Sequence, residues 1–211
     1  MADILQKIAE NLYKGEDQEV AGLVRKALDK GLNPGDILSG GLIAGMDEVG
    51  RDFKAGDLFV PEVLIAARAM HVGMDILRPL LAEGDAAGAG KYLIGTVKGD
   101  LHDIGKNLVK MMVEGAGFQT IDLGADVEPA AFVNAVREHQ PNLLGMSALL
   151  TTTMVNMKAT IEALEEAGLR DSVEIMIGGA PVTAAYAEQI GADAYAPDAA
   201  SAVDVARELA A

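Results

Sequence analysis

One histidine in this chain of 211 residues has a setting that suits metal chemistry. It is His102, in the stretch Gly99-Asp100-Leu101-His102-Asp103-Ile104-Gly105, where Asp100 precedes it by two residues on an expected loop. A carboxylate that accepts one ring N–H of a neutral imidazole fixes its tautomer and directs the other ring nitrogen at a metal. The alternative is that His102 caps the helix that follows or fills a polar niche. The Asp100–His102 pair alone leaves both interpretations open.

A metal site made only of protein side chains is disfavoured, because such a site needs three or four ligands. The sequence has no cysteine, and its other histidines are His71, between core positions of an expected helix, and His139, at an expected helix end before a proline. One good ligand without companions indicates that a macrocycle supplies the remaining coordination. Cobalt in a corrin and iron in a porphyrin both fit that requirement.

The composition excludes several classes of partner. The chain carries 17 basic and 32 acidic residues, a formal net charge of −15, and these charges are spread through the sequence. Nucleic acids and anionic membrane surfaces both attract clustered Lys and Arg, so we expect neither as a partner. No stretch approaches the roughly 18 uninterrupted apolar residues of a membrane span. We therefore expect a cytoplasmic protein that does not associate with a membrane.

The two halves of the chain have different hydrophobic periods. Up to about residue 81, apolar residues recur at helical spacing in four blocks, which predicts an antiparallel four-helix bundle at 1–82. The third block follows Asn33-Pro34, a typical cap and first-turn pair, and the fourth begins at Pro61. Residues 83–90 are small and glycine-rich without periodicity, which indicates a linker.

Residues 91–211 are expected to form an α/β domain. Short apolar runs alternate there with helical stretches, at 92–97, 120–123, 143–146, 174–177 and 194–195. This alternation predicts a doubly wound, five-stranded parallel sheet of flavodoxin-like (Rossmann-like) topology. Ligands of such sheets bind beyond the carboxyl ends of the strands, where the strand order reverses. The least ordinary stretches of the domain fall at that edge: 98–107, 147–153 and 178–181.

Three of these segments together resemble a known signature. Asp100-x-His102-x-x-Gly105, followed by Ser147-x-Leu149 and then by Gly178-Gly179, is similar to the corrinoid-binding (cobalamin-binding) signature of methionine synthase and of the small corrinoid proteins of anaerobic methyltransferase systems. The helical half resembles the same families at 45–70. The resemblance therefore covers nearly the whole chain.

The resemblance implies roles for individual residues. His102 is the lower axial ligand of the cobalt in place of the cofactor's own base (the base-off form), and Asp100 hydrogen-bonds His102; these two are the candidate catalytic residues. A serine of methionine synthase extends this relay. The matching residue here is Thr153, which keeps the hydroxyl and adds a methyl, and whether the relay extends that far stays open. The other positions implied to contact the corrinoid or its nucleotide tail are Gly99, Leu101, Asp103, Ile104, Gly105, Ser147, Leu149, Thr151, Gly178, Gly179 and Ala199.

Two apolar residues of the helical half match a cap over the cofactor. The resemblance implies that Phe53 and Val60 lie over the upper face of the corrin and shield the methyl group. Without the resemblance, Phe53 is equally well explained by core packing at a helix end, and Val60 by an apolar lead into Pro61.

The function that the resemblance implies is methyl transfer. Cobalt(I) accepts a methyl group through a substrate:corrinoid methyltransferase, and methyl-cobalt(III) passes it through a second methyltransferase to a tetrahydrofolate-type or thiol acceptor. Methylamines, methanol and aryl methyl ethers are the candidate donors, and a reductive activating protein is a further expected partner. The chain is then one subunit of such a system, not a complete enzyme.

Three alternatives belong to other functional classes. They are a corrinoid mutase subunit, a corrinoid-dependent sensor, and a flavodoxin-like signalling domain without a cofactor. The four-helix half disfavours the mutase subunit, which normally lacks such a cap. The absence of a basic DNA-reading segment from the sequence disfavours the sensor.

Overall fold

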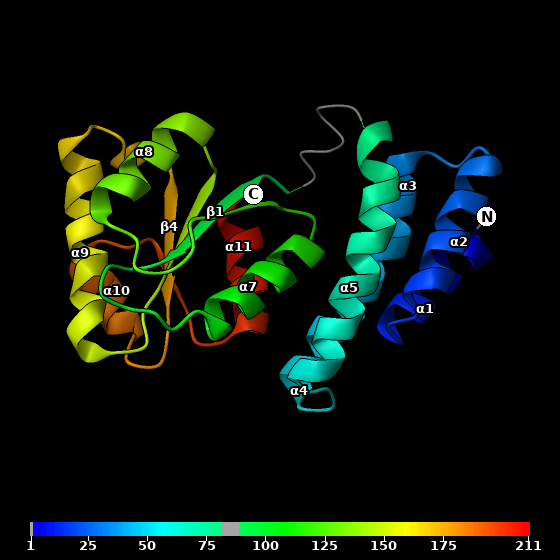
Figure 1. Ribbon diagram of the computed structural model, residues 1–211, viewed down its shortest axis with the longest axis horizontal. Coiled ribbons are helices and arrows are strands. Elements are labelled where there is room, and N and C mark those ends of the chain that lie inside the picture. Colours follow the sequence, from blue (N-terminus) through cyan, green and yellow to red (C-terminus); the bar gives the residue numbers. More distant parts are fainter. Residues whose placement is uncertain (1, 82–88) are drawn as a thin grey trace. The chain divides into compact units, whose positions relative to one another are not determined.

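The computed structural model describes residues 2–81 and 89–211, and these residues divide into two compact units. One unit is helical and is formed mainly by the residues before 89, and the other is an α/β unit formed mainly by the residues from 89 onward (Figure 1). Of the predicted linker at 83–90, residues 83–88 lie outside the described residues. None of the helices in the described ranges has the length and apolar content that a membrane crossing requires.

The helical unit contains the four helical blocks predicted from the sequence. Its elements are α1 (Ala2–Tyr13), α2 (Asp17–Asp29), α3 (Pro34–Ile37), the π-helical segment η1 (Leu38–Ile43), α4 (Ala44–Ala55), α5 (Val60–Leu77) and the short turn η2 (Arg78–Leu80). The predicted third helix is thus divided among α3, η1 and α4, which follow one another without a break. It begins as predicted, because the Asn33 side chain accepts a hydrogen bond of 2.8 Å from the Gly35 N–H and Pro34 occupies the first turn.

The helical unit is held together by an apolar core and by close helix contacts. α1 and α5 each pack against α2 and α4. Small residues allow one of these approaches, because a Cβ atom added at Gly45 would lie only 3.0 Å from the Cα of Ala9. The core side chains include Ile8, Leu12, Val20, Val24, Leu42, Val49, Val63 and Met70.

The α/β unit contains a five-stranded parallel sheet in the order β2-β1-β3-β4-β5, as predicted. The strands are β1 (Lys91–Thr96), β2 (Gln119–Asp122), β3 (Leu143–Ser147), β4 (Glu174–Gly178) and β5 (Ala194–Ala196). The helices are α7 (Ile104–Gly115), α8 (Pro129–His139), α9 (Thr151–Glu166), α10 (Ala184–Ile190) and α11 (Ala199–Leu209), and a 3-10 turn η3 (Arg170–Ser172) precedes β4.

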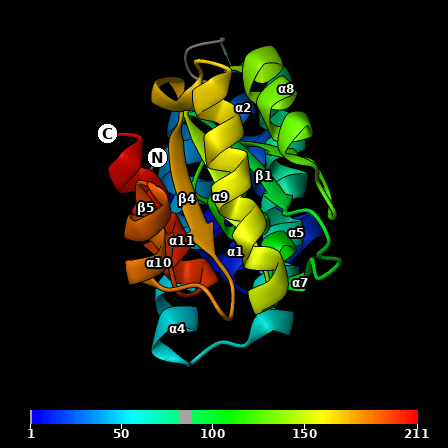
Figure 2. The same cartoon turned by 90° about the vertical axis from the view of Figure 1, so that its left-hand side faces the viewer.

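Helices cover both faces of this sheet. α8, α9 and α10 lie on one face and α7 and α11 on the other (Figure 1), and the first face is turned toward the viewer in Figure 2. Both neighbours of β1 run parallel to it, with Tyr92 opposite Thr120 in β2 and opposite Leu143 in β3. In the order β2-β1-β3-β4-β5, the chain passes from β1 outward to β2 on one side, and from β3 outward to β4 on the other. The loops after β1 and β3 therefore lie at the point where the strand order reverses.

Candidate functional site

The loop after β1 brings Asp100 and His102 into direct contact. Nδ1 of His102 lies 2.7 Å from Oδ1 of Asp100, and the same oxygen accepts the backbone N–H of His102 at 3.0 Å. The Asp100 side chain is fully buried, whereas 51% of the His102 side chain is exposed. A proton on Nδ1, shared with a carboxylate, leaves the lone pair on Nε2 of a neutral ring. Asp100 thus holds the His102 ring through Nδ1, while half of the His102 side chain is exposed.

The second oxygen of Asp100 is held by the segment that follows β3. Oδ2 accepts the Thr153 hydroxyl at 2.6 Å and the backbone N–H groups of Leu149 and Leu150 at 2.7 and 3.4 Å. Burial raises the pKa of Asp100, but hydrogen bonds from Thr153, from peptide N–H groups and from His102 outweigh it and hold that pKa well below the usual range. Asp100 is therefore an anion that links Thr153 to His102.

Four large apolar residues close to His102 in the chain, or bonded to its partner Asp100, have exposed side chains. Leu101 and Ile104, on either side of it in the chain, are 75% and 83% exposed, and Leu149 and Leu150, whose N–H groups reach Asp100, are 44% and 43% exposed. Exposed side chains of this size that gather around one polar group are typical of a binding surface for an apolar ligand. The surface near His102 therefore offers apolar side chains to a ligand.

The predicted glycines differ in their surroundings. Gly179 has a φ of +126°, and a Cβ atom there would lie 1.9 Å from the carbonyl oxygen of Ala148, so the backbone of this strand end requires glycine. Gly178 ends β4, and its Cβ would lie 2.9 Å from the Ala196 carbonyl oxygen. At Gly105, in the first turn of α7, a Cβ would meet nothing within 4 Å. Gly105 therefore borders open space, whereas Gly178 and Gly179 are packed against neighbouring backbone.

The remaining predicted residues lie at three places. Ser147 ends β3, Thr151 begins α9 and Ala199 begins α11, all in the α/β unit. Asp103 accepts a hydrogen bond from the Asn107 side chain at 3.1 Å and so belongs to the start of α7. Phe53 in α4 and Val60 at the start of α5 belong to the helical unit, and their role as a cap stays a prediction. The direct contacts therefore join Asp100, His102, Leu149 and Thr153.

The sequence reasoning missed four polar residues beside the site. Lys106 in α7 is 2% exposed and forms an ion pair with Asp122 at the end of β2. Asp126 and Asn156 contact the loop that carries Asp100, at 2.6 Å from the N–H of Gly99 and 2.9 Å from the carbonyl of Lys98. A lysine within an apolar helix stripe is a signal for the ion pair. Asp126 and Asn156 carry no such signal, because they bind backbone groups.

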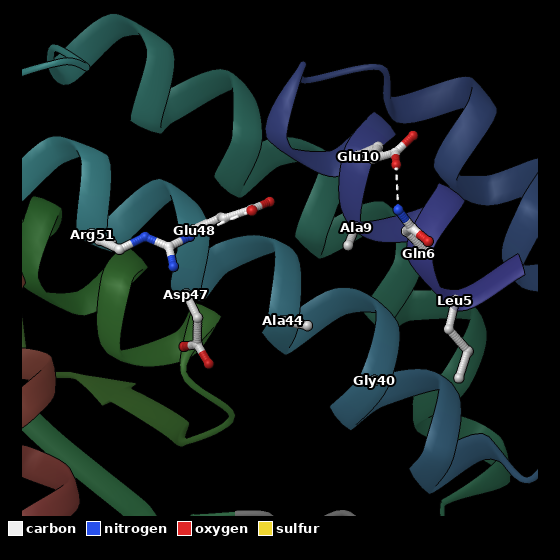
Figure 3. Close-up of a pocket in the computed structure, with 9 residues that line it drawn as sticks. All are labelled: Leu5, Gln6, Ala9, Glu10, Gly40, Ala44, Asp47, Glu48 and Arg51. Atoms are coloured by element: carbon white, nitrogen blue, oxygen red, sulfur yellow. Dashed lines mark hydrogen bonds and ion pairs between the residues drawn. The ribbon is translucent and has the colours of Figure 1, made fainter. Parts of the chain in front are cut away.

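A groove on the helical unit lies between α1 and the η1–α4 segment (Figure 3). Glu10 and Gln6 are joined there by a hydrogen bond of 3.0 Å, and Arg51 pairs with Glu48 at 3.4 Å. None of the predicted site residues lines it. Its lining residues are Leu5, Gln6, Ala9, Glu10, Gly40, Ala44, Asp47, Glu48 and Arg51.

The donor set at His102 suits a macrocyclic metal complex. Among residues 2–81 and 89–211, no group of three or more His, Asp or Glu side chains could hold a metal ion. A single oriented imidazole near exposed apolar side chains would provide one axial ligand and apolar contacts for the ring. This combination fits a metal whose other ligands come from the macrocycle.

Comparisons with known proteins match both units. A family model described as a B12 binding domain matches residues 90–204, and a second one with that description matches residues 4–78. The dimethylamine corrinoid protein of Methanosarcina barkeri is 45% identical over 209 residues, which cover 98% of this chain and 97% of that protein. Trimethylamine corrinoid protein 1 of Methanosarcina acetivorans is 41% identical over 209 residues, with the same shares covered.

A solved structure has the same fold. A chain in the crystal structure of the methanol:cobalamin methyltransferase complex from Methanosarcina barkeri superimposes with a TM-score of 0.89 at 29% identity. The match covers 99% of this chain and 80% of that one. The likeness therefore extends over both units of the protein.

Proposed function

This chain belongs to the family of B12-binding corrinoid proteins, and from that premise we propose that it is a methyl carrier with His102 as the lower ligand of its cobalt. The single observation that supports this most is the continuous link from Thr153 through buried Asp100 to the half-exposed ring of His102. The B12-binding match at 4–78 adds a helical domain, a feature that favours a methyl carrier over a mutase subunit.

The corrinoid, bound with its own base displaced, supplies the cobalt that accepts and releases the methyl group. The protein's part is to hold one nitrogen in place. Asp100 is anionic and keeps a proton on Nδ1 of His102, which leaves Nε2 as the donor. Because Thr153 and two peptide N–H groups already stabilise the carboxylate, Asp100 can share that proton without becoming protonated itself.

The proposal assigns the two domains different tasks. The α/β domain at 91–211 holds the corrinoid, with Gly105 beside open space that is available to the nucleotide tail. The helical domain at 1–82 shields the methyl group with the apolar side chains of Phe53 and Val60. Val60 is 38% exposed, which leaves its side chain available for such a contact.

The proposed partners are two methyltransferases and a reductive activating protein, all in the cytoplasm. The relatives named above are corrinoid proteins of dimethylamine and trimethylamine, so we propose a methylated amine as the donor. The test is transfer of a labelled methyl group from each of dimethylamine, trimethylamine and methanol, in the presence of the matching methyltransferase, to the reduced, cobalamin-loaded chain. Labelling from methanol alone would contradict the amine assignment and leave the carrier function intact.

The ligand role of His102 is tested by spectroscopy of the cobalamin-loaded chain. When the chain carries ¹⁵N-labelled histidine, the electron paramagnetic resonance spectrum of the wild-type cobalt(II) form should show the two-line splitting of one ¹⁵N ligand. His102→Ala should lack this ¹⁵N splitting, even if the cofactor's own unlabelled base binds the cobalt instead. His139→Ala is the matched control, because it removes a histidine at the end of α8 and should leave the spectrum unchanged. Indistinguishable spectra of the wild type and His102→Ala would rule out His102 as the ligand.

A further inference from the structure

A tight turn at residues 97–100 directly precedes the Asp100–His102 contact. The N–H of Asp100 donates to the carbonyl of Val97 at 3.1 Å, which closes a four-residue turn, and Gly99 at its third position has a φ of +79°. This hydrogen bond and this φ are those of a type II turn. In such a turn, the central peptide presents its carbonyl and its N–H to the outside. Here that peptide joins Lys98 to Gly99, directly before Asp100.

Both sides of this central peptide are held by other elements. The Asn156 side-chain amide on α9 donates to the Lys98 carbonyl at 2.9 Å. The carboxylate of Asp126, in the loop between β2 and α8, accepts the Gly99 N–H at 2.6 Å. The backbone N–H of Asp126 also donates to the Asp100 carbonyl at 3.0 Å. The peptide therefore cannot rotate to the alternative turn type without breaking two hydrogen bonds.

Asp126 has an unusual backbone for this task. Its φ is +56°, and among the described residues Gln140 is the other non-glycine residue with a positive φ. Asp tolerates this region better than most residues, although glycine adopts it more readily. The loop that carries Asp126 is fixed beside the end of β1, because the carbonyl of Gly124 and the N–H of Val127 both bond the backbone of Thr96. Asp126 is thus a rigidly mounted acceptor for the turn.

We propose that Asp126 and Asn156 form a turn clamp that sets the direction of Asp100 and, through it, of His102. Both are positioning residues, since their contacts are to the loop backbone and not to the ring of His102. The inference rests on the proposed ligand role of His102. The Nδ1–Oδ1 contact of 2.7 Å requires a fixed orientation of the Asp100 side chain, and the turn sets that orientation. If the turn is loosened, the orientation of the His102 imidazole is held less firmly.

The test compares variants of the full chain loaded with cobalamin. Asp126→Gly accepts the left-handed φ but removes the acceptor, whereas Asp126→Asn keeps an acceptor oxygen and tolerates that φ. The measurement is the cyanide concentration that displaces the imidazole from cobalt(III), followed in the visible spectrum. Loss of a hydrogen bond to a charged group should lower it about tenfold in Asp126→Gly, and loss of a neutral one about fivefold in Asn156→Ala.

Two controls separate positioning from general stability. Asp126→Asn should stay within about twofold of the wild type, because an acceptor remains. Gln140→Gly relieves the other left-handed residue, at the end of α8, and should leave the cyanide titration unchanged. Wild-type cyanide sensitivity in Asp126→Gly would overturn the proposal.

A second measurement needs no cofactor. In the nuclear magnetic resonance spectrum of the cofactor-free chain, Asp126→Gly should lose the hydrogen-bonded signal of the Gly99 amide and weaken that of the His102 Nδ1 proton. Loss of the first with no change in the second would refute the clamp. A wild type that shows both signals but binds no cobalamin would instead refute the proposed function, while the clamp would stand.

Discussion

Thr153→Val tests whether the Thr153 hydroxyl stabilises the Asp100 anion. Valine has nearly the same shape as threonine but cannot donate to Oδ2 of Asp100, which lies 2.6 Å from the hydroxyl. Thr153 is 7% exposed and the Asp100 side chain is fully buried, so water does not readily replace the lost donor. A hydrogen bond to a charged group contributes about 1.5 to 3 kcal/mol. Peptide N–H groups still serve Asp100, so we expect a loss of about 2 kcal/mol in the free energy of unfolding at pH 7.

This loss should depend on pH, and its sign follows from the pKa of Asp100. That pKa is lowered from the ordinary value of 3.8, so the ionised carboxylate stabilises the fold above that pH, and the stabilisation disappears as the pH falls through the folded-state pKa. Thr153→Val raises the pKa of Asp100 toward its ordinary value. The difference in stability between the wild type and the variant is therefore full at pH 7 and shrinks below pH 3.8.

Urea unfolding of the cofactor-free chain, followed by tyrosine fluorescence, measures the effect. The sequence has four tyrosines, of which Tyr92, Tyr186 and Tyr195 lie in the α/β unit, so the signal reports mainly that unit. Thr153→Ser is the control, because it keeps the donor and its effect should not vary with pH. If Thr153→Val matched Thr153→Ser at pH 7, or lost the same free energy at every pH, the reasoning on Asp100 would be wrong.

Two further tests of the residues around the site use urea unfolding of the cofactor-free chain, one comparing Gly179 with Gly105 and one on Asp122. Gly179→Ala should lower the free energy of unfolding by about 3 kcal/mol, because its Cβ would lie 1.9 Å from the Ala148 carbonyl oxygen. Gly105→Ala is the control and should be neutral or stabilise by up to about 1 kcal/mol, because its Cβ would meet nothing within 4 Å. Equal effects of the two substitutions would contradict the packing at Gly179. Asp122→Asn should cost about 3 kcal/mol at pH 7, because it leaves the buried Lys106 without its partner. Burial raises the pKa of Asp122, but the Lys106 contact outweighs it and lowers that pKa. The stability difference between the wild type and Asp122→Asn should therefore shrink as the pH falls into the acid range. A stability difference that does not change with pH would contradict the role of the Asp122 carboxylate.

The fold was predictable because each half of the sequence repeats one period. The change from helical spacing to alternating short apolar runs predicted both units, and the flavodoxin-like topology assumed for five such runs predicted the strand order that the structure has. The π-helical segment η1 was not predicted, because apolar spacing does not distinguish one wide turn from an α-helical one. Gly40 and Gly41 lie in that segment, and Cβ atoms there would approach Leu5 and Ile8 to 3.1 Å. The close approach of α1 is thus visible only once the helices are packed.

The site was predictable in proportion to how local its contacts are. Asp100 and His102 are two residues apart, so a contact between them was a local inference, although the pair alone left a helix cap or a polar niche as the alternative to a metal ligand. The Thr153 hydroxyl joins Asp100 across 53 positions, and only the resemblance to a known family suggested it. Asp126 and Asn156 were missed because they bind the Lys98–Gly99 peptide, and a contact to backbone leaves no trace in residue type. The sequence could not show which backbone groups of the loop around Asp100 face Asp126 and Asn156.

Threonine at position 153 does more than replace a serine. Its hydroxyl bonds Asp100, and its methyl carbon faces the turn, since a Cβ atom at Gly99 would lie 3.6 Å from Cγ2 of Thr153. A branched Cβ also restricts the side-chain rotamers that a helix permits. The methyl therefore packs beside the turn that carries Asp100 while the hydroxyl binds its carboxylate. Thr153→Ser should keep the hydrogen bond yet lose up to about 1 kcal/mol of packing, and Thr153→Ala should lose both contributions. If Thr153→Ser and the wild type unfolded at the same urea concentration, the methyl would have no part in holding the turn.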